Sequence, residues 1–209
     1  MSKSHTSPSD VAFSPAVKAI QTLRGSREAY SGPEADAGWP TEIDDNLAAF
    51  LAAQTGVFFA TASADGQPTI QHRGGPPGFL HVLDKTTIAF ANFAGNRQFI
   101  TLGNLSENPK VHIFVLDYVN RQRVKIWGEA RVVDDDPALL EALMPRGYRA
   151  RPEQVILIKV KAWNTNCRQH IPQKFDAADV KAALELRETR IAELEAEVAA
   201  LKGTPLPAV

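Results

Sequence analysis

The sequence predicts a mainly β protein with helices, an α+β fold built on an antiparallel β-barrel. Short β-like runs follow one another with turn signals between them, which is typical of antiparallel sheets and barrels. These runs do not alternate with long helices, as a doubly wound parallel sheet requires. The end of the chain is different in character, because it becomes rich in Ala, Leu, Glu, Lys and Arg and predicts a separate helix.

Composition limits the class of protein. The chain has 209 residues, of which 44% are apolar, and this is enough for one domain with a buried core. A net charge of −1 gives no basic field, so neither nucleic acid nor a membrane surface is an expected partner. The single cysteine, Cys167, fits a reducing compartment. With no signal-peptide pattern and no bilayer-spanning run, we expect a soluble, cytoplasmic protein.

The N-terminal segment predicts little regular structure apart from one helix. Residues 1–10 are small and polar and include a proline, which favours disorder. A helix is predicted from Pro15 to about Arg27, with Ser14 as its N-cap and apolar residues at helical spacing. Residues 31–40 are rich in Gly, Pro and Ala and predict a linking loop.

The central part predicts hairpins with inserted helices. The turn at Asp65-Gly66 is a strong hairpin signal, since glycine tolerates positive φ, and a second hairpin turns at Asp84-Lys85. Thr41 or Asp44 is the predicted N-cap of the helix that precedes the first hairpin. The predicted strands cover 57–63, 69–73, 79–83, 87–92, 110–117, 122–133 and 154–163, and the helices cover 44–54, 96–106 and 137–143.

Residues 177–202 carry a heptad stripe. Apolar residues alternate in steps of four and three, with Leu184, Ile191 and Val198 at a and with Val180, Arg187, Leu194 and Leu201 at d. β-Branched residues at a with Leu at d favour a parallel two-stranded coiled coil. The alternative is a single amphipathic helix that packs on its own domain.

Two cationic segments suit a ligand that carries phosphate. In the first, Gln71-His72-Arg73-Gly74, the Arg offers a planar fork of donors to phosphate oxygens and the Gly lets backbone approach a ligand closely. His72 and Arg73 alternate along a strand, so their side chains lie on opposite faces. The alternative is a polar surface loop before a Gly-Pro turn.

The second segment runs from Ala91 and Asn92 to Asn96 and Arg97. Asn96 is predicted as a helix N-cap with Arg97 in the first turn, where free amides and a cation meet. Arg is unfavourable beside the positive end of a helix, and this points to a bound anion.

Further basic residues alternate along the strand 122–133. Arg121, Arg123 and Lys125 are expected to share one face, either a solvated face or one that contacts a ligand. Near the end of the barrel, Cys167 has Arg168 and His170 as sequence neighbours, which can lower a thiol pKa. One Cys and scattered His residues do not give the ligand spacing of a metal site, so none is predicted.

Taken in order, these motifs resemble the pyridoxamine 5′-phosphate oxidase-related FMN-binding proteins. The resemblance extends over residues 43–175, and Asn166–Ile171 resembles the closing motif of one uncharacterised branch. The segments that carry it are Asp65–Pro68, Gln71–Phe79, Ala91–Arg97 and Asn104–Pro109.

The resemblance implies a split β-barrel homodimer with FMN at the subunit interface. It divides the chain into an N-terminal disordered segment and helix (1–40), an FMN-binding split-barrel domain (41–175) and a C-terminal heptad-like helix and tail (176–209). The residues that it implies as cofactor-binding are Gln71, His72, Arg73, Gly74, Ala91, Asn92, Asn96, Arg97, Arg123, Arg168, Gln169 and His170.

The implied function is an FMN-binding oxidoreductase whose flavin carries the redox chemistry with a small-molecule substrate or electron donor. True pyridoxamine 5′-phosphate oxidation is not expected. The family's Lys-ending phosphate segment becomes Arg73-Gly74-Gly75 here, and its C-terminal Arg-x-His signature is not evident. The alternatives are a non-catalytic flavin-binding or redox-sensing module, and a haem- or deazaflavin-binding relative, with His72 or His170 as the haem ligand.

Overall fold

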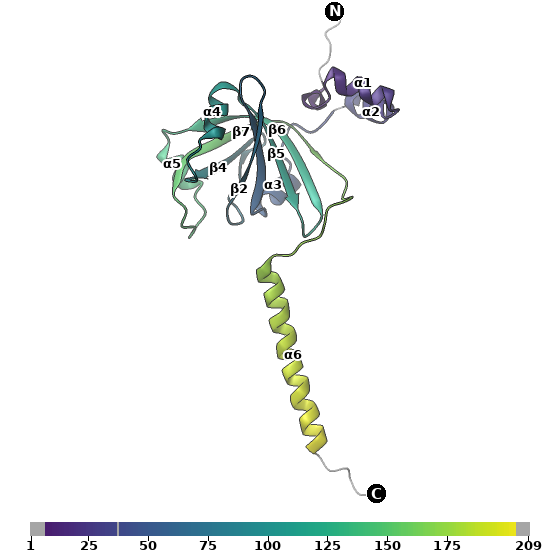
Figure 1. Ribbon diagram of the computed structural model, residues 1–209, viewed down its shortest axis with the longest axis vertical. Helices are drawn as coiled ribbons and strands as arrows, with labels where there is room; N and C mark the ends of the chain where they lie inside the picture. The colour runs from purple at the N-terminus through teal and green to yellow at the C-terminus, as the bar shows by residue number, and fades with distance from the viewer. Residues whose placement is uncertain (1–6, 37, 204–209) are drawn as a thin grey trace, which may run out of the picture. The chain divides into compact units, whose positions relative to one another are not determined.

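The computed structural model describes residues 7–36 and 38–203 (Figure 1). The chain folds into two compact units. The larger unit holds the described residues up to Asp117 together with Gln122–Gln169, and the smaller unit holds Tyr118–Arg121 and the residues from His170 onwards. Within the described part of the chain, no helix is long and apolar enough to cross a bilayer.

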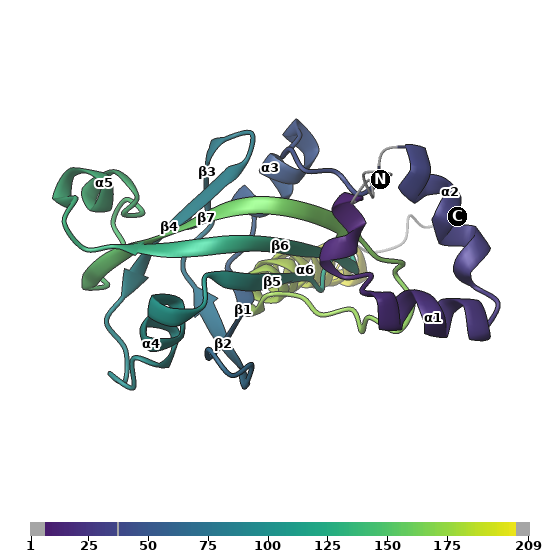
Figure 2. The same cartoon turned by 90° about the horizontal axis from the view of Figure 1, so that it is seen from above.

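Seven strands of the larger unit form one sheet, in the order β2-β1-β5-β6-β7-β4-β3. Every neighbouring pair is antiparallel, and the long strands β6 and β7 run side by side through the sheet (Figure 2). The strands are β1 (Gly56–Ala62), β2 (Pro68–Gly74), β3 (His81–Asp84), β4 (Thr87–Phe93), β5 (Lys110–Asp117), β6 (Gln122–Val133) and β7 (Pro152–Thr165).

The local turn signals predicted most of these strands. The second hairpin is shifted, because β3 begins at His81 and includes Asp84, which pairs with Thr87, so the turn lies at residues 85–86 and not at Asp84-Lys85. β5 and β6 have the predicted bounds, and Gly66 in the first hairpin turn has a φ of +92°. β7 is longer than predicted at both ends, because Pro152 still pairs with Phe93 of β4 and Thr165 with Val124 of β6.

Three helices of the larger unit pack around the sheet: α3 (Asp45–Ala52), α4 (Ile100–Glu107) and α5 (Pro137–Ala142). Asp44, one of the two predicted caps, accepts a 2.7 Å hydrogen bond from the backbone N–H of Leu47. Leu47 and Leu51 of α3 enter the main core with side chains of both halves of the sheet. Helix α4 is joined to β1 by a 2.9 Å hydrogen bond that Asn104 donates to Thr61.

The N-terminal region is more ordered than predicted. Residues 1–6 of the predicted disordered segment lie outside the described residues, but Pro8–Val11 form a 3₁₀ turn, η1. The predicted first helix, α1 (Pro15–Leu23), is capped by Ser14 and ends before Gly25, which has a φ of +76°. Glycine in the left-handed conformation ends helices, so α1 stops short of Arg27.

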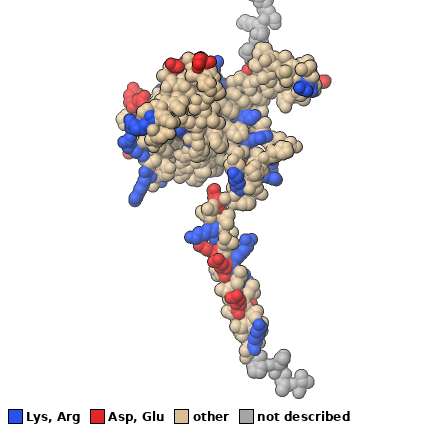
Figure 3. Space-filling model, in the orientation of Figure 1, with Lys and Arg blue, Asp and Glu red and all other residues tan. Residues whose placement is uncertain are grey.

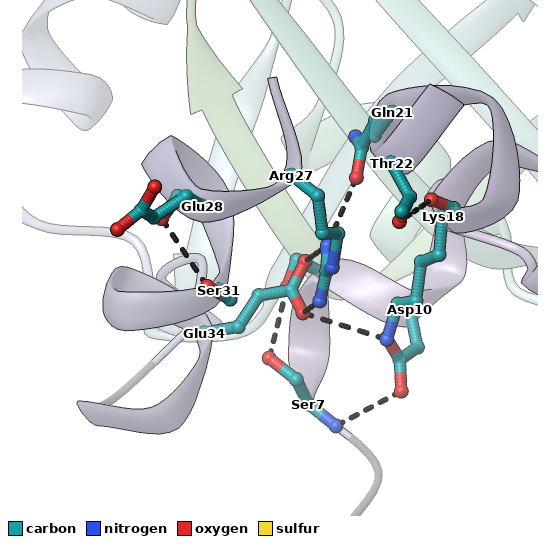
Figure 4. Close-up of polar contacts among 10 residues, drawn as sticks. Ser7, Asp10, Lys18, Gln21, Thr22, Arg27, Glu28, Ser31 and Glu34 are labelled. Atoms are coloured by element: carbon teal, nitrogen blue, oxygen red, sulfur yellow. Dashed lines mark hydrogen bonds and ion pairs between the residues drawn. The ribbon is translucent and has the colours of Figure 1, made fainter. Parts of the chain in front are cut away.

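The loop predicted over residues 31–40 is wrong, because helix α2 (Arg27–Asp36) occupies most of it and contains Pro33. Local composition favours a loop, but an ion pair within the helix and contacts with α1 stabilise it. Glu34 accepts hydrogen bonds from Arg27 and lies 3.4 Å from Lys18, which also pairs with Asp10 (Figure 4). These contacts, with the Arg27 bond first, lower the pKa of the Glu34 carboxyl.

Aromatic rings connect the N-terminal region to the sheet. Trp39 stacks on Trp127 of β6 with a centroid distance of 4.8 Å, and Phe13 meets Trp39 edge-on at 4.9 Å. On the same strand pair, His112 of β5 lies 4.8 Å from the Trp127 ring.

The smaller unit is dominated by helix α6 (Ala177–Gly203), which has no buried residue. Before it, Lys174 lies over the ring of Tyr118, and Gln173 donates a 2.8 Å hydrogen bond to the carbonyl of Val119. Acidic and basic side chains are intermixed along the visible face of α6 (Figure 3).

Candidate functional site

A small cavity of about 60 Å³ lies between β2, β4 and the segment that leads into α4. We call it the Arg73 cavity. The fold brings together five of the predicted site residues here: Gln71, Arg73, Asn92, Asn96 and Arg97. The other lining residues are Phe93, Gly95, Phe99, Ile100, Thr101, Leu102 and Glu153.

Arg73 is a half-buried cation whose hydrogen-bonding capacity is only partly used. Its Nη2 donates a 2.9 Å hydrogen bond to Thr101 Oγ1, which in turn donates to Gln71 Oε1 at 3.0 Å. Its Nε is buried and has no hydrogen-bond partner among the described residues. Burial lowers the pKa of the Arg73 guanidinium, because water no longer solvates the charge. A buried donor without a partner is costly, so this site favours an incoming acceptor.

The predicted helix start at Asn96 is wrong. Helix α4 begins at Ile100, and its N-cap residue is Phe99, which has no side-chain cap. Asn96 instead accepts a 3.3 Å hydrogen bond from the backbone N–H of Gln98. Arg97 and Phe99 have φ angles of +61° and +54°, and these left-handed conformations keep the preceding residues out of the helix. Such non-glycine strain often marks functional segments.

Arg97 lines the cavity but is largely exposed. Its guanidinium lies 5.2 Å above the Phe99 ring, and its Nη1 lies 3.8 Å from Glu153 Oε1. The same Glu153 oxygen accepts a 2.9 Å hydrogen bond from Arg151. Arg97 therefore already has a weak carboxylate neighbour, whereas Arg73 has none among its recorded contacts.

Two lining residues were missed by the sequence interpretation. Thr101 is 4% exposed and lies on the buried face of α4 with Leu105. Its position four residues before Leu105, where an apolar residue is expected, was the signal in the sequence that could have identified it. Glu153 lies near the start of β7, one residue before the predicted start of that strand, and it belongs to no recognised motif.

A neighbouring cavity of about 140 Å³ contains the predicted residues His72, Gly74 and Ala91, and it shares Arg73 and Asn92 with the first. As predicted, His72 and Arg73 lie on opposite faces of β2. His72 is on the exposed face and Arg73 on the half-buried face. The protein itself constrains both Gly74 and Gly75, however. A Cβ on Gly74 would lie 2.8 Å from the His72 ring, and the Gly75 N–H already donates to the carbonyl of Thr55 at 3.1 Å. The Gly75 amide is therefore not free for a ligand.

Arg123 and Arg168 line a different, larger cavity of about 340 Å³, which we call the Arg123 cavity. It lies between α3 and parts of β6 and β7 and includes the aromatic side chains of Phe50 and Trp163. Arg123 Nε and Asn166 Oδ1 are buried without hydrogen-bond partners in the described chain. Within one chain, the predicted residues thus fall into two separate groups.

The remaining predicted residues lie elsewhere. Arg121 is not in β6 but in the preceding turn, with a φ of +52°, so the expected three-residue basic face retains only Arg123 and Lys125. Gln169 does not line either named cavity, and its side chain accepts a 3.8 Å contact from the exposed Cys167 thiol. His170 belongs to the smaller unit and has a φ of +61°.

Comparison with known proteins identifies one family. Residues 43–167 match the family described as Pyridoxamine 5′-phosphate oxidase. A comparison with curated protein sequences gives no match. Together with the seven-stranded antiparallel sheet and its helices, the family match confirms the predicted α+β split barrel.

Solved structures from several bacteria are similar. HupZ of Group A Streptococcus is 20% identical, with 64% of this chain and 100% of that chain covered and a TM-score of 0.49. A putative pyridoxamine 5′-phosphate oxidase from Lactobacillus delbrueckii is 18% identical, with coverages of 60% and 95% and a TM-score of 0.47. An FMN-binding protein from Syntrophomonas wolfei is 14% identical, with coverages of 73% and 95% and a TM-score of 0.46.

Proposed function

Because the chain belongs to the pyridoxamine 5′-phosphate oxidase family, we propose that it binds FMN and acts as a flavin-dependent oxidoreductase. Family membership supports a flavin-binding fold of the oxidoreductase type. The observation that carries the choice of FMN is the Arg73 guanidinium, which is half-buried and leaves Nε without a partner beside the Thr101 hydroxyl. A phosphate oxygen is a charged acceptor that forms strong hydrogen bonds with a guanidinium.

The FMN phosphate is proposed to occupy the Arg73 cavity. With about 60 Å³, the cavity is much smaller than the roughly 300–1,000 Å³ typical of whole-ligand pockets, so it suits the phosphate end alone. Arg73 supplies the main charge, and Asn96 and Arg97 line the outer side. The Glu153 carboxylate would repel the phosphate, and its hydrogen bond from Arg151 offsets part of this negative charge.

The ring end of FMN is proposed to contact a second copy of the chain. Arg123 and Arg168 do not line the Arg73 cavity, so one chain does not offer both groups in one cavity. In a homodimer, the partner copy can present its Arg123 cavity to the ring. Phe50 and Trp163, with the unpaired donor of Arg123, suit a planar group that carries acceptor atoms.

The bound flavin would supply hydride or electron transfer, and the side chains named above would bind and orient it. The substrate or electron donor is proposed to be a small molecule. A flavin-binding or redox-sensing module without turnover would use the same phosphate contacts, so only kinetics separates it from the enzyme.

The test begins with the absorbance spectrum of the purified full chain and an FMN titration. Flavin bands and saturable FMN binding are expected, whereas a Soret band or a protein that takes up no FMN would refute the proposal. Arg73→Gln should weaken FMN binding by about tenfold to a hundredfold, as expected for a lost charge-assisted hydrogen bond. Arg131→Gln, an exposed arginine of β6 with the same charge change, is the matched control.

Stopped-flow reduction by nicotinamide cofactors then distinguishes enzyme from storage module. Reduction of the bound flavin followed by reoxidation with an acceptor supports turnover. Tight FMN binding with no reduction by any tested donor supports the non-catalytic alternative.

A further inference from the structure

We propose that α6 is a self-association surface, which forms a parallel two-stranded coiled coil with α6 of a second copy of this chain. The proposal rests on the helix alone and is independent of flavin binding. It identifies a segment that lies beyond residues 43–167, the part matched by the family.

The apolar stripe of α6 is exposed along the helix. Its a and d side chains remain exposed over the length of the helix, which is about 40 Å at 1.5 Å per residue. The exposed fractions are 44% for Val180, 51% for Leu184, 55% for Ile191, 42% for Leu194, 47% for Val198 and 75% for Leu201. Most helical stability in proteins comes from packing such a face, so this stripe favours a partner.

The stripe borders a shallow apolar groove on the helix surface. Ile191, Leu194 and Val198 line it at successive a and d positions, together with Ala199. The two charged residues along its edge, Glu195 and Lys202, are both at e. This is the arrangement of a coiled-coil seam, in which apolar knobs are flanked by charges that choose the partner.

Charge complementarity selects a second copy in parallel orientation. In a parallel pair, Arg190 at g faces Glu195 at e of the other helix, and Glu197 at g faces Lys202 at e. Both contacts are attractive, and each occurs twice by symmetry. Within one helix, Arg190 reaches only Glu193 at 2.8 Å and Glu197 at 3.8 Å.

The antiparallel arrangement is less favourable. In the register that packs Ile191 against Leu194, residues at e face one another. Glu188 then lies opposite Glu195, and Lys181 opposite Lys202. Like charges at these e positions repel, and these two repulsive pairs outnumber the one attractive pair at g, Arg190 with Glu197, so the pattern disfavours this register.

Arg187 is the single charged residue of the stripe, at a d position. A polar residue at one core position of a coiled coil lowers stability and specifies register and number of strands. Arg187 can therefore fix the register of the α6 pair, because any shifted register would bury it against an apolar layer.

A membrane surface is a poorer partner for this helix. Between Ala177 and Gly203 there are six acidic and four basic residues, so the segment is net negative. Helices that lie on anionic lipid carry more Lys and Arg than acidic residues on their polar face. Helix α6 has no such excess of basic residues.

The test uses disulfide trapping in the full chain with Cys167→Ser, which removes the only native thiol. Leu201→Cys places one thiol at d, and a parallel pair brings the two copies of this thiol together. Ala196→Cys, at the outward-facing f position, is the matched control. In a glutathione redox buffer, we expect crosslinked dimer from Leu201→Cys and several-fold less from Ala196→Cys.

A charge swap separates pairing between chains from effects within one helix. Arg190→Glu in the Leu201→Cys background should lower the crosslink yield about fivefold, which corresponds to about 1 kcal/mol. Adding Glu195→Arg should restore the yield, because the interchain pair is re-formed with reversed charges. Residues 190 and 195 are five positions apart and do not pair within one helix.

The outcomes are decisive in either direction. Equal crosslinking at positions 201 and 196, or none at 201, would overturn the proposal. Crosslinking of a Leu184→Cys, Leu201→Cys double variant without crosslinking of either single variant would show an antiparallel pair and would also contradict the proposal. A failure of the charge swap to restore the yield would contradict the parallel register.

Discussion

Arg73 in β2 donates a 2.9 Å hydrogen bond to the hydroxyl of Thr101 in α4, a residue 28 positions further along the chain. The same hydroxyl donates to Gln71, which is two residues before Arg73 on the same face of the strand. One buried threonine thus fixes two polar side chains on one face of β2. This leaves the Nε edge of the guanidinium without a protein partner.

Replacing Thr101 by Val should destabilise the fold by about 1–3 kcal/mol, because the change leaves a buried donor of Arg73 and the Gln71 acceptor unpaired. Urea unfolding of the full chain measures the effect. Thr101→Ser keeps the hydroxyl and is expected to lose less. Equal losses for Val and Ser would mean that the methyl packing, and not the hydrogen bonds, is what matters.

Arg97→Asn should separate the backbone strain of this segment from its charge. Asn tolerates the left-handed φ of +61° better than Arg, so stability is expected to stay within about 0.5 kcal/mol of the original. FMN affinity should fall several-fold through loss of the guanidinium. Thermal unfolding and FMN titration measure the two effects, and unchanged affinity would refute a phosphate contact by Arg97.

Glu153→Gln should strengthen FMN binding by about twofold to fivefold, because it removes a carboxylate that opposes the phosphate and pairs with Arg97. The control is Glu129→Gln, which makes the same charge change at a residue paired with Lys161. Weaker FMN binding in Glu153→Gln would show that Glu153 holds Arg97 or Arg151 in place for the ligand.

His112 predicts a specific pH dependence of stability. Burial, and secondarily Lys125, lower the pKa of His112 below its ordinary value of 6.5, so the folded protein holds the ring neutral. Between that lower pKa and 6.5, the unfolded chain binds more protons, and the free energy of unfolding falls as the pH falls. The neutral His112 ring makes its full contribution to the free energy of unfolding above pH 6.5.

Unfolding by urea at a series of pH values tests this expectation. His112→Phe keeps an aromatic ring beside Trp127 but does not titrate, so the slope below the ordinary histidine pKa should decrease. An unchanged slope in the variant would assign the pH dependence to other groups.

Local signals predicted most of the strands. The Asp65-Gly66 turn and the strands β5 and β6 were predictable from short stretches of sequence. Turn geometry and period-two patterning depend on residues that are close together in the chain. The pairing of β1 with β5 and of β4 with β7 joins distant segments, and no single-sequence pattern specified it. Helix α2 was missed because part of its stabilisation comes from α1, where Lys18 pairs with Glu34 and Gln21 accepts a hydrogen bond from Arg27.

The candidate site was predictable in part. Gln71, Arg73, Asn92, Asn96 and Arg97 were identified from residue type, and the fold brings them together in one cavity. The sequence could not show that Phe99 and Arg97 adopt left-handed backbone, which moves the helix start by four residues. Nor could it separate Arg123 and Arg168 from this group, since that depends on the tertiary fold.

Strand β2 is at one end of the sheet order, so β1 is the single strand that pairs with its backbone. Sheet edges are where strands open first and where aggregation by strand addition begins. The side-chain bonds from Gln71 and Arg73 to α4 give this edge a second attachment. If the proposed phosphate occupies the free edge of Arg73, ligand binding would stabilise this edge of the sheet further, and removal of the ligand would make β2 easier to open.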